Sequence, residues 1–266
     1  GLAGTWAVSL DPDDVGVEQG WGRGGYAESI RLPGSLQAQG FGERPTIEGP
    51  WTTSIGSAML RDEKYGDFTA GEDFGSPLWL TPKRLYVGAA WYAREIEIPA
   101  AWRDRRVELF LERPHWGTTV YLNGERVGKQ QDGLGVPHSH DLTEAIAAAG
   151  VGRHTLAIRV DNRVIVAVGL DAHAVSDQTQ SNWNGIVGDI ELRSTPMVWL
   201  DDVQVFPDYE ARAARIEMSI GNATGEAGRG EVSLGIQSVN GRTFVAGPMR
   251  EAVRWSGGER SVVSIE

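Results

Sequence analysis

The sequence contains no cysteine, which excludes disulfide bonds and thiolate metal sites and leaves the redox compartment open. Its longest apolar run, residues 164–170, is far too short to span a bilayer. Basic side chains are in the minority, with 25 Lys and Arg against 36 Asp and Glu and a formal net charge of −11. This balance repels polyanions, and no cluster of Lys or Arg offsets it, so neither nucleic acid nor an anionic membrane is an expected partner.

Several enzyme motifs are also missing. No P-loop, dinucleotide-binding glycine motif or Ser-His-Asp arrangement in a plausible context occurs, and no cofactor is expected. No signal peptide is visible, but residues 1–6 resemble the interior of a longer gene product, so the localisation stays open.

What the sequence does have is 35 glycines, 10 tryptophans and many short alternating runs. In residues 92–98, Ile96 and Ile98 fall on one face of a strand while Glu95 and Glu97 fall on the other. The same period of two recurs in residues 107–111, 155–160 and 186–192. Short strands between glycine-rich turns predict an antiparallel all-β protein, specifically a β-sandwich.

Two local signals punctuate these strands. Asn123-Gly124 predicts a hairpin, because both central positions of a type I′ turn need a positive φ. Residues 143–149 predict a short helix with Thr143 as its N-cap and Gly150 as its C-terminal stop. By contrast, residues 40–85 show little periodicity, and their aromatic side chains favour an ordered excursion packed on the sandwich over disorder.

A domain boundary is predicted at residues 194–196. New alternating strands follow it, and they favour a second sandwich of the immunoglobulin type. About 70 residues remain where such a domain needs about 100, so the second sandwich is expected to be incomplete.

Six stretches occur in an order that resembles a known family. They are "RLPGSLQ" at 31, "AAWYAREIEIPAAW" at 89, "TTVYLNGERVG" at 118, "PHSHDLTEAI" at 137, "HTLAIRVDN" at 154 and "NWNGIVGDIELRSTPMVWLDDVQVFPD" at 182. This series, which covers essentially the whole chain, resembles the N-terminal region of family 2 glycoside hydrolases, the β-galactosidase, β-glucuronidase and β-mannosidase group. The resemblance implies a galactose-binding-like jelly-roll domain in residues 1–196 and an immunoglobulin-like domain in residues 197–266.

In that family the chemistry belongs to a third domain, a (β/α)₈ barrel in which two glutamates carry out a retaining mechanism. The present sequence shows no βαβα alternation, so this chain alone is expected to have no hydrolytic activity. The resemblance implies that its partners are a β-glycoside in the full-length protein and the barrel domain of its own chain. Family members often assemble through these sandwich domains, so a homo-oligomer is also possible.

The resemblance also points to a sugar-contacting loop. In β-galactosidases an Asp-Gln pair stands eight residues before the Gly-Ile of the next strand, and Asp177-Gln178 stands at that distance from Gly185-Ile186. The Asp177 carboxylate could accept hydrogen bonds from two sugar hydroxyls, with the amides of Gln180 and Asn182 alongside it. Trp183 is a further candidate contact, although packing at the entry of the strand would also explain it.

The alternative for the polar loop residues is ordinary turn capping through side-chain to backbone hydrogen bonds. A second candidate surface is "SPLWLTPKRLY" at 76–86, where Trp79 and Lys83 are possible sugar contacts. Core packing is the competing explanation for Trp79.

Two other clusters are weighed as metal sites and set aside. His138 and His140 would share a strand face, but no third ligand is nearby in the sequence, which favours a surface or core role. The acidic "DPDD" at 11–14 lacks the calcium-loop pattern and is predicted to be a solvated turn. No metal site is therefore predicted.

Three functional hypotheses remain at this point. The chain is a non-catalytic part of a family 2 glycosidase, with a weak lean towards a β-galactosidase from the Asp-Gln spacing. Alternatively, it is an independent carbohydrate-binding module or a structural sandwich without a sugar site, because a fold alone does not fix a function.

Overall fold

The structure is a computed structural model that describes residues 1–49, 51, 61–69, 74–75, 80–165, 169, 172, 175, 182–238, 244–257 and 260–265. The chain divides into two compact units. The first unit comprises Gly1–Arg103 and Val107–Arg193, and the second comprises Asp104–Arg106 and Ser194–Glu266. No helix among the described residues is long and apolar enough to cross a membrane.

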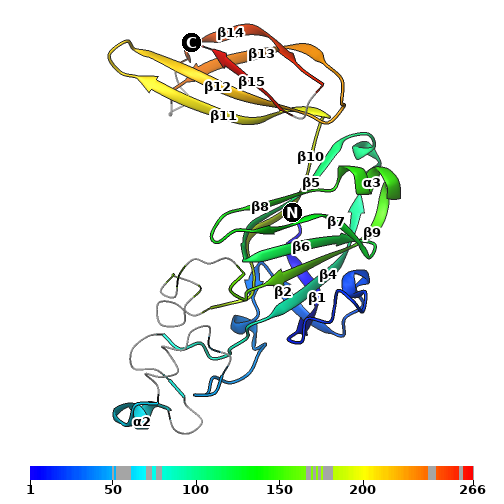
Figure 1. The fold of residues 1–266 in the computed structure, drawn as a ribbon. Coiled ribbons are helices and arrows are strands. Elements are labelled where there is room, and N and C mark those ends of the chain that lie inside the picture. The colour runs from blue at the N-terminus through cyan, green and yellow to red at the C-terminus, as the bar shows by residue number, and fades with distance from the viewer. Residues whose placement is uncertain are drawn as a thin grey trace. The chain divides into compact units, whose positions relative to one another are not determined.

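Two antiparallel sheets form the first unit (Figure 1). One sheet has six strands in the order β2-β1-β4-β9-β6-β7, and the other has four in the order β3-β10-β5-β8. The strands are β1 (Gly4–Asp11), β2 (Glu28–Leu32), β3 (Gly34–Ser35), β4 (Ala89–Ile98), β5 (Arg106–His115), β6 (Gly117–Leu122), β7 (Glu125–Asp132), β8 (His138–Asp141), β9 (Gly152–Asp161) and β10 (Gly185–Thr195). The helices among the described residues of this unit are η1 (Trp21–Arg23), η2 (Gln37–Gln39), η3 (Glu63–Tyr65), α2 (Gly66–Thr69), η4 (Ala100–Trp102) and α3 (Thr143–Ala149).

The core of the first unit lies between its two sheets. The inward residues of β4, β5 and β9 are buried, as the alternating pattern predicts, and the glutamates at 95 and 97 are exposed on the opposite face. Large side chains from both sheets meet there, among them Trp6, Tyr92 and Leu109. Fully burying one aliphatic side chain such as that of Leu109 stabilises the fold by about 1.5–3 kcal/mol, so this layer holds the two sheets together.

A second, smaller apolar cluster covers the outer face of the six-stranded sheet. The segment between β1 and β2 crosses this face and places Trp21 against Trp91, with ring centroids 6.4 Å apart. Two glycines allow the close approach, because a Cβ on Gly16 would come within 2.5 Å of Trp91 and one on Gly22 within 2.6 Å of Tyr121. The segment between β1 and β2 therefore lies directly on the sheet.

The second unit contains a three-stranded sheet, β11-β12-β15, and a two-stranded sheet, β13-β14. Its strands are β11 (Val198–Asp208), β12 (Ala213–Asn222), β13 (Gly228–Gln237), β14 (Phe244–Trp255) and β15 (Arg260–Ile265). The alternating residues Ile216, Met218 and Ile220 of β12 are buried. The all-β, antiparallel class is thus confirmed, while the assignment of domain types to residues 1–196 and 197–266 stays a prediction.

The local turn predictions have two outcomes. The hairpin is confirmed: Asn123 and Gly124 have φ values of 53° and 91° between β6 and β7. Helix α3 also lies where it was expected and ends at Gly150, but Thr143 is not its N-cap. Leu142 takes that position, because the Thr143 hydroxyl accepts a hydrogen bond from the Val107 backbone N–H at 3.1 Å.

The structure also shows the two clusters that were set aside as metal sites, the turn at residues 11–14 and the pair His138 and His140. The prediction of a solvated turn is wrong for Asp11, which is buried and accepts hydrogen bonds from the backbone of Val15 and Gly16 and from the Trp91 indole. His138 and His140 are buried and share the hydroxyl of Thr118, at 2.7 and 2.9 Å. Among the described residues no group of three or more His, Cys, Asp or Glu is arranged to bind a metal.

Candidate functional site

Five strand ends of the six-stranded sheet lie in one row. Asp11 pairs with Ala89, Ala89 with Asp161, Asp161 with Gly117, and Gly117 with Asp132. This row is called the rim below. The connection from β9 to β10 starts at the rim, and the chain that precedes β4 ends there, so both candidate sugar segments are attached to this edge of the first unit.

Three buried asparagines join these two segments. They are Asn162, Asn182 and Asn184, each no more than 1% exposed, and they are called the asparagine cluster. Asn162 donates its side-chain amide to the Asn182 side-chain oxygen at 3.2 Å, and Asn182 donates back to the Asn162 backbone carbonyl at 3.0 Å. This reciprocal pair closes the β9–β10 connection at its two ends.

The same cluster binds the chain that leads into β4. Asn162 donates to the Tyr86 carbonyl at 2.8 Å and accepts from the Gly88 backbone N–H at 2.8 Å. Asn184 donates to the carbonyls of Gly88 and Val160, both at 3.0 Å, and accepts from the Tyr92 hydroxyl. The polar atoms are therefore satisfied inside the protein, which is the condition under which buried amides stabilise a fold.

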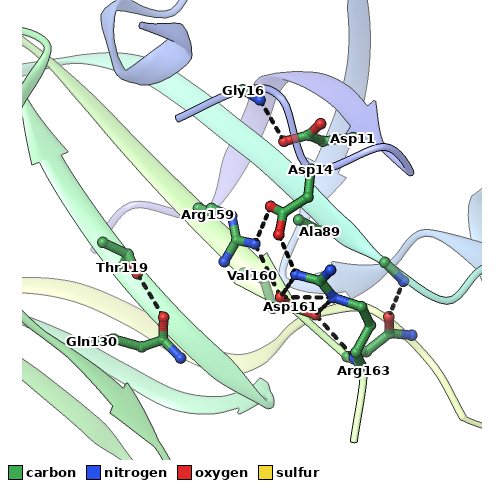
Figure 2. Close-up of polar contacts among 12 residues, drawn as sticks. Asp11, Asp14, Gly16, Ala89, Thr119, Gln130, Arg159, Val160, Asp161 and Arg163 are labelled. Atoms are coloured by element: carbon green, nitrogen blue, oxygen red, sulfur yellow. Dashed lines mark hydrogen bonds and ion pairs between the residues drawn. The ribbon is translucent and has the colours of Figure 1, made fainter. Parts of the chain in front are cut away.

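A charged network lies beside the asparagine cluster. Figure 2 shows Arg159 and Arg163 reaching the carboxylates of Asp14 and Asp161. Arg159 lies 2.5 Å from Asp14 and 3.0 Å from Asp161, and Arg163 lies 2.6 Å from Asp14 and 2.5 Å from Asp161. These four residues, the carboxylate–arginine network, connect the end of β9 to the segment that follows β1.

Charge pairing dominates the protonation of this network. Burial alone would raise the pKa of Asp161, but the hydrogen bonds from Arg163 and the charge of Arg159 lower it below the ordinary value. The pKa of Asp14 is lowered in the same way, with hydrogen bonds from Arg163 and Arg159 outweighing burial. The hydrogen bonds that Arg163 donates to Asp161 raise the pKa of Arg163, so Asp14, Asp161 and Arg163 are charged at neutral pH.

Trp183 lies between two members of the asparagine cluster. Its indole stacks on the imidazole of His115, the last residue of β5, with ring centroids 4.6 Å apart and an interplanar angle of 17°. His115 is buried, whereas Trp183 is only half-buried, so part of this residue is open to solvent.

The six predicted sugar contacts have different outcomes. Asn182 is buried and bonded to Asn162, so its amide does not face solvent. Trp183 and Lys83 lie on the surface of the first unit, the former half-buried and the latter exposed. Asp177, Gln178 and Trp79 lie outside the described residues. Their roles, like those of the other three, stay predictions.

Sequence reasoning missed Asn162, Asp14 and the two arginines. A usable signal was present, because Arg159, Asp161 and Arg163 are spaced by two and therefore share one face of a strand and its extension. Three charges of alternating sign on one face predict an ion-pair network. Asn162 falls on the opposite face, next to Val160, where a polar side chain needs buried partners.

No family model matches this chain. Among curated proteins it is 24% identical over 232 residues to a β-glucuronidase of Rattus norvegicus, covering 79% of this chain and 30% of that protein. It is 23% identical over 223 residues to the β-galactosidase large subunit of Leuconostoc lactis, covering 82% of this chain and 32% of that protein. Its relatives are family 2 glycoside hydrolases.

Solved structures of these glycosidases share the fold. A Bacteroides uniformis β-glucuronidase matches 99% of this chain with 18% identity and a TM-score of 0.63, over 26% of its own chain. A Ruminococcus gnavus β-glucuronidase matches 99% with 18% identity and a TM-score of 0.59, over 38% of its own chain. The predicted resemblance to family 2 is confirmed, and this chain spans about a third of the length of the curated relatives that it matches.

Proposed function

We propose that this chain is the non-catalytic N-terminal part of a family 2 β-glycosidase. Its two β units would brace a (β/α)₈ barrel that carries the catalytic glutamates, and the rim of the first unit would line part of the carbohydrate site. One observation carries the proposal: the chain resembles glycosidases over about four fifths of its own length but over only about a third of theirs.

The geometry of the rim supports the sugar-facing part of the proposal. The two segments predicted to contact sugar meet on the asparagine cluster, through Tyr86 and Gly88 on one side and Asn182 and Asn184 on the other. Asp177 and Gln178 are proposed as hydroxyl-binding residues, because an ionised carboxylate accepts charge-assisted hydrogen bonds. The β-glycoside is proposed to be a galactoside or a glucuronide, since the relatives carry both names.

Hydrolysis assays test the non-catalytic assignment. The chain as given is assayed on nitrophenyl β-galactoside, β-glucuronide and β-mannoside, and so is the same chain extended by the sequence that follows it in its gene. We expect no turnover by the first protein and turnover of one substrate by the second. Turnover by the chain alone, or none by an extended protein that contains a complete barrel, would contradict the proposal.

Calorimetry separates this proposal from an independent carbohydrate-binding module. A supporting, non-catalytic part of a site gives weak binding of free sugars, because most contacts belong to the barrel. Submillimolar binding of galactose, glucuronate or mannose by the chain alone would favour the module instead.

A further inference from the structure

Residues 182 to 184 alternate between the interior and the surface of the first unit. Asn182 and Asn184 point inwards and are at most 1% exposed, while Trp183 between them is half-buried. Both asparagines bond to groups on other strands or loops, including the Asn162 carbonyl and the Val160 carbonyl. The backbone on each side of Trp183 is therefore fixed by side-chain hydrogen bonds that are shielded from water.

The backbone of this stretch is bonded as well. The Asn184 N–H donates to the Gln37 side-chain oxygen at 3.1 Å, and its carbonyl accepts from the Leu36 N–H at 2.8 Å. With side-chain and backbone groups both bonded, Asn184 has little freedom to rotate. This restricts the direction in which the neighbouring Trp183 side chain leaves the chain.

The support beneath the indole is fixed in the same way. His115 ends β5, and Trp116 follows it and is buried. The Trp116 backbone N–H donates to the Asp161 carbonyl at 3.1 Å, and its indole N–H donates to the Arg163 carbonyl at 2.8 Å. The imidazole on which Trp183 stacks thus belongs to the same hydrogen-bonded edge as the asparagine cluster.

We propose that Trp183 is an aromatic platform for a pyranose ring and that Asn162, Asn182, Asn184 and His115 are its positioning residues. One indole face rests on His115, and the part of Trp183 that stays exposed is the part that would pack against the apolar C–H face of a sugar. A side chain that is already ordered loses less entropy when it binds, so the buried amides raise affinity without touching the ligand. The choice of a pyranose as ligand rests on the proposed function, whereas the positioning of Trp183 does not.

Fluorine NMR of the full chain labelled with 5-fluorotryptophan tests the positioning. The Trp183 signal is the one that Trp183→Phe removes. We expect a single narrow signal displaced by the ring current of His115, and we expect Asn182→Ala to broaden it or move it towards the position of free 5-fluorotryptophan. An unchanged signal in a folded Asn182→Ala variant would overturn the positioning role.

A matched control and a second variant keep this test decisive. Asn222 is also buried, donating to the carbonyls of Glu226 and Ser256 in the second unit, so Asn222→Ala should leave the Trp183 signal unchanged. If Asn182→Ala does not fold, His115→Gln decides, because it removes the stacked ring and leaves the asparagine cluster intact. It should shift the Trp183 signal, and an unchanged signal would overturn the proposed support by His115.

Titration of the labelled chain with methyl β-galactoside and methyl β-glucuronide, at millimolar concentrations, tests the ligand. We expect a saturable shift of the Trp183 signal with at least one sugar, and about a tenfold weaker apparent affinity in Asn182→Ala, equivalent to roughly 1.4 kcal/mol. No response to either sugar would overturn the platform while leaving the positioning result intact. The proposed function is judged separately, by turnover in the extended protein.

Discussion

The asparagine cluster and the carboxylate–arginine network connect the same edge of the first unit by different physics. The asparagines are neutral and almost completely buried, and each bond joins an amide to an amide or a hydroxyl. The network is charged and graded in exposure: the side chain of Asp161 is 3% exposed and that of Asp14 is 36% exposed. The contribution of the asparagine cluster to stability should not depend on salt or pH, whereas that of the carboxylate–arginine network should depend on both.

The comparison shows that one edge of a sheet can hold its loops by two kinds of interaction that differ in free energy. A buried donor that loses its partner has no water to replace it, so neutral amides become costly to disturb only when fully enclosed. Ion pairs gain from partial burial, but screening reduces that gain wherever one partner reaches solvent. Four substitutions separate these contributions.

Asp161→Asn should have the largest effect on stability. The substitution removes the buried negative charge shared by Arg159 and Arg163, and removing one partner of a buried ion pair costs about 3 kcal/mol. Urea unfolding followed by tryptophan fluorescence measures it, because every tryptophan except Trp199 and Trp255 lies in the first unit. The exposed Asp13→Asn is the control and should change the free energy of unfolding by less than about 0.5 kcal/mol.

Asn184→Ala should rank second. It leaves the carbonyls of Gly88 and Val160 and the hydroxyl of Tyr92 without their buried partner, at a cost of about 2 kcal/mol. The same unfolding experiment at low and high salt should give the same loss. A loss that shrinks with salt would mean that the asparagine cluster acts through its charged neighbours.

The pair His138 and His140 should respond to pH in a third way, because it is neutral at pH 7, like the asparagine cluster, but can be protonated at lower pH. Burial lowers the pKa of His140 from 6.5 to about 4, so the unfolded chain binds a proton that the folded chain excludes. Its contribution to stability is present above pH 6.5 and is lost as the pH falls towards 4. Unfolding at a series of pH values should show a shallower slope for His140→Gln than for the wild type, and equal slopes would contradict this role.

Asp14→Asn should have the smallest effect. Asp14 is partly exposed, so its pairs with Arg159 and Arg163 should contribute about 1 kcal/mol or less, and high salt should reduce that further. Its lowered pKa means that the contribution is present above the ordinary value of 3.8 and disappears at lower pH. Wild type and variant should therefore converge in acid, which unfolding at pH 7 and pH 3 would measure.

The sequence predicted elements whose signals are local. Ile96 and Ile98 alternate with glutamates, and Asn123-Gly124 carries the positive φ values of its turn, so neither needs distant partners to be recognised. The prediction of Thr143 as an N-cap failed for the opposite reason. Its hydroxyl accepts a hydrogen bond from the Val107 N–H, which is 36 residues distant in the chain.

The candidate site was harder to predict from the sequence, because more of its contacts join residues that are far apart in the chain. Asn182 was predicted to contact sugar, but it is buried against Asn162, which lies 20 residues earlier in the chain. Asp14 meets Arg159 across 145 residues. Spacing along a sequence does not contain such pairings, whereas the family resemblance supplied the fold in which they form.

The row of strand ends at Asp11, Ala89, Gly117, Asp132 and Asp161 has a consequence for how such a domain can diversify. The cross-strand pairs behind this row join backbone groups of the strands, so they do not depend on the length or composition of the connections beyond it. New recognition surfaces can therefore be added at this edge while the sheets keep their register.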